Sequence, residues 1–154
     1  MIRRVSAVFV AAALLSTGCS GQTPEAKQAA ADYLQRAAQE PGAVQTESGL
    51  VFRTLTPGTG AQPKATDVVR VHYHGTLPGG KIFDSSVDRG EPAEFGLNQV
   101  IPCWTEGVQR MHVGEKAELV CPAAIAYGDR GAGGVIPPGA TLIFEVELLA
   151  IKSR

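Results

Sequence analysis

One stretch decides the fold class of this chain: DVVRVHYHGT, residues Asp67–Thr76. Apolar and polar side chains alternate along it, which is the period of a β-strand with one buried face. Val69, Val71 and Tyr73 share the apolar face, while Arg70 and two histidines share the other. We therefore predict a strand whose apolar side faces a core.

The C-terminal segment Thr141–Ile151 repeats this alternation. Its even-numbered positions from Leu142 to Leu148 are apolar, and Glu145 and Glu147 lie on the opposite face. Three shorter segments are strand candidates: Leu50–Leu55, Ala93–Leu97 and Glu115–Cys121. Turns rich in glycine and proline separate the candidates, at 57–60, 77–80 and 131–139.

One segment between these strands has helical spacing. Pro102 is a favourable first residue of a helix, because the N–H that proline lacks would be unpaired there. Trp104, Val108 and Met111 follow at helical intervals and share one face. Many strands with one short helix predict an α+β domain, in which a helix packs on one face of an antiparallel sheet.

Five motifs occur in order along this domain: VHYHGTL at 71–77, GKIFDSS at 80–86, VIPCW at 100–104, AYG at 126–128 and IPPGATL at 136–142. Together they resemble the FKBP-type prolyl isomerases, especially the bacterial exported branch, from about Gly49 to Lys152. One such motif would be weak evidence for the family, whereas five in order at compatible spacing are strong evidence. The resemblance implies a bent antiparallel sheet wrapped around one short helix, with a pocket between them.

The resemblance also implies which residues form the pocket. Carried over by motif, the catalytic set is Tyr73, Phe83, Asp84, Ile101, Trp104, Tyr127 and Phe144. The substrate-binding set is Arg89, Phe95, Val100, Val135 and Ile136. Trp104 would form the floor, and the backbone N–H of Ile101 would bind the substrate carbonyl. The chain departs from common family residues at Ala93, Cys103 and Ala132, which bears on peptide preference and inhibitor affinity.

Several of these residues also have an ordinary structural interpretation. Trp104 and Phe144 would be core residues in almost any fold. Asp84 could cap the turn formed by Ser85 and Ser86. The functional interpretation depends on the ordered set of motifs.

Residues 1–18 have the pattern of a signal peptide. After a positively charged start, the apolar run Val5–Leu15 is shorter than the ~20 residues that a membrane-spanning helix needs. The sequence LSTGC at 15–19 resembles a bacterial lipobox, which implies a lipid anchor on Cys19. The alternative is ordinary cleavage after Gly18.

Residues 19–42 predict a linker and a short helix. Thr23 can cap a helix that begins at Pro24, and Pro41-Gly42 ends the pattern. The helix could hold the domain off the membrane or could form a dimer. Its apolar face is mostly alanine and buries little area, which favours the spacer and a monomer. The isomerase domain is then expected over residues 43–154.

Cys103 and Cys121 remain as an even pair in a domain that is expected to be exported. Disulfides persist in exported proteins, so a disulfide between the two is favoured over two buried thiols. His72 and His74 share a strand face but lack an evident third ligand, so we predict no metal and no cofactor. The net charge of −1 gives no sign of nucleic-acid binding.

Two functions follow from the sequence. The first is a peptidyl-prolyl cis-trans isomerase that acts on proline-containing exported or envelope polypeptides and assists their folding. The second is an FKBP-like binding module or chaperone. Retention of Phe83, Asp84, Ile101, Trp104 and Tyr127 favours the enzyme. The expected location is the bacterial cell envelope, at the outer membrane facing the periplasm if the host has two membranes.

Overall fold

The computed structural model describes residues 23–152, so the expected signal peptide and Cys19 lie outside the described residues. The helices are α1 Pro24–Ala38, α2 Ser86–Arg89 and α3 Pro102–Val108, with 3-10 turns η1 Ala123–Ile125 and η2 Gly128–Arg130. The strands are β1 Ala43–Gln45, β2 Val51–Thr56, β3 Val68–Thr76, β4 Ile82–Ser85, β5 Ala93–Gly96, β6 Lys116–Cys121 and β7 Leu142–Lys152. Within these residues, no helix combines the length and apolarity that crossing a membrane requires.

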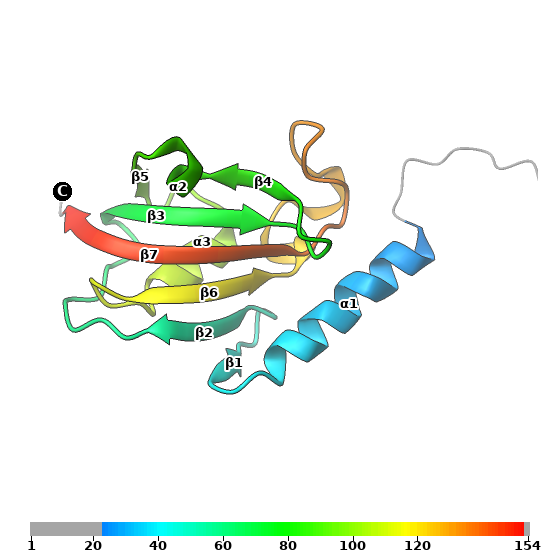
Figure 1. Ribbon diagram of the computed structural model, residues 1–154, viewed down its shortest axis with the longest axis horizontal. Helices are drawn as coiled ribbons and strands as arrows, with labels where there is room; N and C mark the ends of the chain where they lie inside the picture. The colour runs from blue at the N-terminus through cyan, green and yellow to red at the C-terminus, as the bar shows by residue number, and fades with distance from the viewer. Residues whose placement is uncertain (1–22, 153–154) are drawn as a thin grey trace, which may run out of the picture.

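The strands form one antiparallel sheet in the order β1-β2-β6-β7-β3-β4 (Figure 1). The free edge of β3 is shared by two short strands. β5 pairs with its first half and β4 with its second half, and α2 connects the two. This arrangement brings β4 and β5 to either end of β3, with Tyr73 between them.

The predicted fold class is confirmed, and each predicted strand is present within a few residues of its expected bounds. The sequence prediction omitted β1, β4 and α2, which have three or four residues each and offer too short a pattern to recognise. The predicted helix extended toward Met111, but α3 ends at Val108. Arg110 and Met111 then donate backbone hydrogen bonds three residues back, which tightens the end of the helix into turns.

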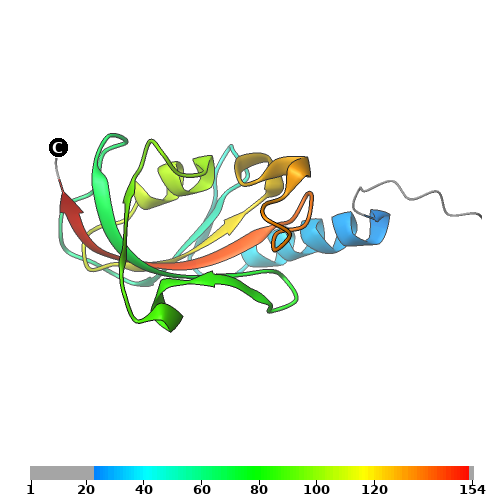
Figure 2. The ribbon, with the colours of Figure 1, turned by 90° about the horizontal axis from the view of Figure 1, so that it is seen from above.

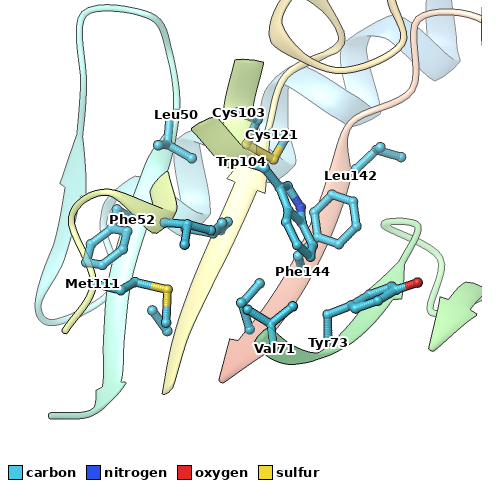
Figure 3. Packing of buried hydrophobic residues seen from close by; sticks show 14 of the residues in the cluster. Leu50, Phe52, Val71, Tyr73, Cys103, Trp104, Met111, Cys121, Leu142 and Phe144 are labelled. Atoms are coloured by element: carbon cyan, nitrogen blue, oxygen red, sulfur yellow. A yellow bond between two sulfur atoms is a disulfide. The ribbon is translucent and has the colours of Figure 1, made fainter. Parts of the chain in front are cut away.

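The main core lies between the sheet and α3 (Figure 2). Val69, Val71 and Tyr73 of β3 face it, as their alternation predicted. A disulfide joins Cys103 of α3 to Cys121 of β6, with their Cα atoms 5.8 Å apart (Figure 3). The helix that carries Trp104 is therefore covalently tied to the sheet.

A second, smaller cluster lies on the opposite face of the sheet. Val51, Val120 and Ile143 are buried there, and the last turns of α1 cover them with Tyr33 and Leu34. Neighbouring residues of a strand point to opposite faces, so Ile143 of β7 faces α1 while Phe144 faces the main core. Neither role considered for α1 from sequence included this contact with its own domain.

Helix α1 starts at the predicted residue and ends at Ala38, shortly before Pro41. The Thr23 hydroxyl accepts a hydrogen bond from the Ala26 N–H at 3.3 Å, and Pro24 occupies the first turn. The helix buries no residue completely. Its first turns extend away from the sheet, as Figure 1 shows.

Candidate active site

An irregularity in the pairing of β3 with β4 shapes one wall of a cavity. The register shifts beside the Gly75–Asp84 pair, which makes Phe83 the extra residue of a β-bulge. A Cβ on Gly75 would lie 2.6 Å from Cζ of Phe83 and 3.1 Å from Cε1 of Phe144. Glycine is therefore required here, because any side chain would displace one of the two aromatic rings.

Trp104 forms the floor of this cavity and is 4% exposed. The rings of Tyr73, Phe95 and Phe144 meet it edge-on, with centroid distances of 5.3, 5.5 and 5.3 Å. Phe83 meets Phe144 edge-on in turn, at 5.4 Å. The buried indole N–H of Trp104 has no hydrogen-bond partner within the described residues. Edge-to-face packing of aromatic rings, rather than hydrogen bonding, thus holds the floor.

Three polar side chains form a connected cluster at one side of the cavity. The Tyr73 hydroxyl donates to Oδ2 of Asp84 at 2.5 Å. Arg89 donates from Nη1 to Oδ1 of Asp84 at 2.5 Å and from Nη2 to the Tyr73 hydroxyl at 3.0 Å. The carboxylate of Asp84 therefore accepts two hydrogen bonds, one of them from a cation.

This cluster sets the charges at the cavity. Partial burial would raise the pKa of Asp84, but the hydrogen bonds from Tyr73 and Arg89 outweigh it and leave that pKa below its ordinary value. Burial, followed by the hydrogen bond to Asp84, raises the pKa of Tyr73. At neutral pH the site therefore presents an ionised carboxylate beside a neutral phenol.

The serines that follow Asp84 cap the next helix and hold the strand, and Asp84 does neither. Ser85, not Asp84, is the N-cap of α2, because its hydroxyl accepts from the Asp88 N–H at 3.1 Å. Ser86 accepts the Tyr73 N–H at 2.8 Å, which fixes the strand beside the cavity. Asp84 is therefore left to contact Tyr73 and Arg89.

The two histidines of β3 contact the same serines. Nδ1 of His74 lies 2.9 Å from the Ser85 hydroxyl, and Nδ1 of His72 lies 3.1 Å from that of Ser86. The part of the chain from 23 to 152 contains no group of three or more side chains that could hold a metal ion.

The cavity has a volume of about 460 Å³. It is lined by Tyr73, Phe83, Asp84, Phe95, Gln99, Val100, Ile101, Trp104, Tyr127 and Phe144. The structure thus brings together all seven residues of the predicted catalytic set. Gln99 was missed, because a lone polar residue in the turn before α3 carries no motif of its own.

Three members of the predicted substrate-binding set stand apart from this lining. Arg89 acts on the cavity through its contacts with Tyr73 and Asp84. Val135 and Ile136 line a neighbouring hollow instead, so their contact with a substrate stays a prediction. Ile136 is 7% exposed and packs into the main core, as Trp104 and Phe144 do.

Two polar groups at the cavity are free to meet a ligand. The N–H of Ile101 precedes the first turn of α3 and donates to no acceptor among the described residues. The Tyr127 side chain is 41% exposed, and its hydroxyl has no hydrogen-bond partner between residues 23 and 152. An apolar cavity with two such donors can hold a carbonyl while excluding water from the atoms around it.

A bent antiparallel sheet that holds an aromatic-floored cavity against one short helix defines an FKBP-like domain. Comparison with known families agrees: residues 59–149 match the FKBP-type peptidyl-prolyl cis-trans isomerases. The chain therefore belongs to this family.

Individual relatives show how far the similarity extends. The FKBP-type isomerase FkpA of Aeromonas hydrophila is 60% identical over 79% of this chain and 45% of its own length. The outer membrane protein MIP of Legionella longbeachae is 45% identical over 78% of this chain and 52% of its own. The crystal structure of a peptidyl-prolyl cis-trans isomerase from Pseudomonas syringae has a TM-score of 0.80 and 40% identity, covering 88% of this chain and all of that one. This chain spans about half the length of the two curated relatives.

Proposed function

We propose that this protein catalyses cis–trans isomerisation of X–Pro bonds in polypeptides and thereby assists their folding. Amide resonance gives the bond a barrier of ~18–20 kcal/mol, and uncatalysed isomerisation takes ~10–100 s. An acceleration of about 10⁴-fold requires a barrier lower by roughly 5.5 kcal/mol. No bond breaks in this reaction, so the site needs no nucleophile.

The aromatic floor supports this proposal most strongly. The planar amide is dipolar, and the twisted transition state loses resonance and becomes less polar. A dry pocket built from Trp104, Phe83 and Phe144 therefore disfavours the planar state relative to the twisted one. The free Ile101 N–H suits the role of holding the substrate carbonyl while the bond rotates.

The polar cluster supports a specific role for Asp84. Its charge is balanced by Arg89, and its second oxygen is occupied by the Tyr73 hydroxyl. Asp84 thus positions Tyr73, which packs against Trp104, and places a fixed negative charge beside the amide that rotates. We propose that both effects contribute to catalysis.

The test is to measure isomerisation of a short series of X–Pro peptides by the purified protein, with Asp84→Ala and Tyr127→Phe beside it. We expect catalysis that falls in both variants while their unfolding midpoints stay near that of the wild type. A folded wild-type protein that fails to accelerate the reaction would reject the enzyme. The domain would then be a proline-recognising binding module.

We further propose that the protein is exported and anchored to the cell envelope through a lipid on Cys19, with residues 1–18 removed and residues 19–42 as linker and helix. The lipobox-like sequence supports the anchor, and the Cys103–Cys121 disulfide suits an oxidising compartment. A relative is named an outer membrane protein. Cys19→Ser should remove the lipid mass and release the protein into the soluble fraction. A variant that fractionates as the wild type does would refute the anchor.

We also propose that the protein is a monomer. The apolar turns at the end of α1 are used against the sheet of the same chain, which leaves them unavailable to a partner. Light scattering on the soluble protein should give a monomer mass, and a dimer mass would reverse this proposal.

A further inference from the structure

A second hollow of about 400 Å³ lies next to the cavity. One wall is the turn between β3 and β4, and the other is the loop that follows η2. Each segment is continuous in the chain with residues that line the cavity. Lys81 in the first wall is followed by Ile82 and Phe83, and Arg130 in the second follows Tyr127 closely. A polypeptide held in the cavity can therefore extend into the hollow. In Figure 1 the loop is the orange segment on the side where β4 begins.

Hydrogen bonds shape the hollow before any ligand arrives. Ala132 and Ile136 exchange backbone hydrogen bonds in both directions, each at 3.0 Å, which closes the loop into a tight hairpin. The Gly139 N–H ties its far end to the Gly128 carbonyl at 2.8 Å. Across the hollow, the Leu77 N–H donates to the Lys81 carbonyl at 2.8 Å. Binding here would order little extra chain, which favours affinity.

The hollow combines an apolar wall with two cations at its rim. Val135, which is 43% exposed, and two prolines supply apolar surface. Lys81 and Arg130 are both exposed and line the same hollow. Neither forms an ion pair with any carboxylate between residues 23 and 152.

The acidic groups nearby do not neutralise these cations. Asp84, the carboxylate of the adjoining cavity, is already paired with Arg89 at 2.5 Å. Asp129 precedes Arg130 in the chain but does not line the hollow. The rim therefore presents net positive charge to whatever occupies the hollow.

We propose that this hollow binds an acidic side chain, Asp or Glu, of the same polypeptide whose prolyl bond sits in the cavity. The inference rests on the proposed isomerase function and gives it a substrate class: segments with a carboxylate a few residues from the proline. The carboxylate meets Lys81 and Arg130, and the methylene stem of the side chain covers Val135. A cation at the same position would be repelled, so the hollow selects by charge.

The experiment uses the purified protein and a set of labelled peptides with one neutral X–Pro core. Glu, Gln or Lys is placed in turn at each position two to four residues before or after the proline. Two quantities are measured for each peptide: kcat/KM for isomerisation and Kd by fluorescence anisotropy. We expect Glu to exceed Gln by about fivefold in both quantities at one or two adjacent positions, the size expected for well-placed exposed charge pairs.

Substitutions of Lys81 and Arg130 test whether these two residues cause the preference for Glu peptides. Lys81→Gln with Arg130→Gln should make the Glu and Gln peptides equal, and Lys81→Glu with Arg130→Glu should favour the Lys peptide. Isomerisation of the fully neutral peptide should stay the same in all of them. A matched control, Lys64→Gln with Arg70→Gln, removes the same net charge elsewhere on the surface and should keep the preference for Glu.

The outcomes separate this inference from the proposed function. Equal kcat/KM and Kd for Glu and Gln peptides at every position would overturn the hollow as an acidic subsite, even if catalysis is strong. A preference that survives in the Lys81 and Arg130 variants would also overturn it. Tighter binding of Glu peptides without any catalysis would reject the enzyme and leave the acidic subsite standing. Raising the salt concentration should shrink a genuine preference, because exposed charges are screened.

Discussion

Helices α1 and α3 both begin with a proline, yet the protein uses them differently. Each has proline in its first turn. α1 has 15 residues and buries none of them, while α3 has seven and buries Cys103, Trp104, Gly107 and Val108. In α3, Gly107 lets Leu119 of β6 approach so closely that an added Cβ would lie 2.8 Å from one of its methyl groups. The comparison shows that burial, and not helix length, determines which helix supports the site.

Trp104→Ala should have the largest effect, because it removes the floor of the cavity from the buried helix. Large-to-small changes of this kind cost about 3–5 kcal/mol of unfolding free energy. We also expect isomerisation to be lost, since three aromatic rings lose their common contact. Urea denaturation and the peptide assay measure the two effects. An unchanged midpoint would show that α3 is less essential to the fold than its burial indicates.

Removing the disulfide should have the next largest effect. In the chain-entropy account, a loop closed across 18 residues contributes ~3 kcal/mol to stability. Cys103→Ala with Cys121→Ala should lower the unfolding midpoint accordingly and lower activity less, because packing still holds Trp104. Reductant should shift the midpoint of the wild type but not that of the variant. A reductant effect of equal size in both would contradict the assignment.

The contact between α1 and the sheet should matter less. Leu34→Ala removes part of a half-buried side chain from the cluster around Val51 and Ile143, at a cost of about 1 kcal/mol. Gln35→Ala, on the exposed side of the same helix, is the matched control and should cost almost nothing. Activity should be unchanged in both variants, because α1 lies on the face of the sheet opposite the cavity. Equal stability of the two variants would mean that α1 does not dock.

The smallest effect concerns pH. The pKa of Asp84 is lowered in the folded protein, so its ionised form contributes stability at pH values above the unfolded-state pKa of about 3.9. That contribution is lost as the pH falls through the lower folded-state pKa. The stability difference between wild type and Asp84→Asn should therefore be constant from neutral pH to about pH 5 and shrink below pH 4. A difference that grows with acid would mean that folding raises the pKa of Asp84 instead. The effect is small, because the Asp84 side chain is 44% exposed.

The sequence predicted much of the fold because its long strands carry an unbroken alternation. Val69, Val71 and Tyr73 identified the buried face of β3 without any tertiary information. The start of α1 at Pro24 and the start of α3 at Pro102 followed from local capping rules. These features depend on residues that are close in the chain, so a local pattern is enough to predict them.

The parts that sequence did not predict depend on contacts between distant segments. The bulge at Phe83 arises because the register of β4 shifts against β3, and nothing in IFDS indicates that shift. The docking of α1 depends on Ile143 of β7. This apolar residue lies on the face of the sheet opposite the main core, and its burial is explained only by the position of α1. The position of Ile136, buried in the main core and lining the second hollow, likewise depends on the folded loop around it.

The sequence by itself determined the strands, the two proline-started helices and the set of residues that the family motifs carry. Only the tertiary structure decided how Asp84 is used: Ser85 caps α2, which leaves the carboxylate to Tyr73 and Arg89. It also placed Lys81 and Arg130 at one hollow, although they are far apart in the chain. A local pattern shows which face of a single strand or helix is apolar. A functional site is formed by residues from several elements, so it depends on how those elements pack.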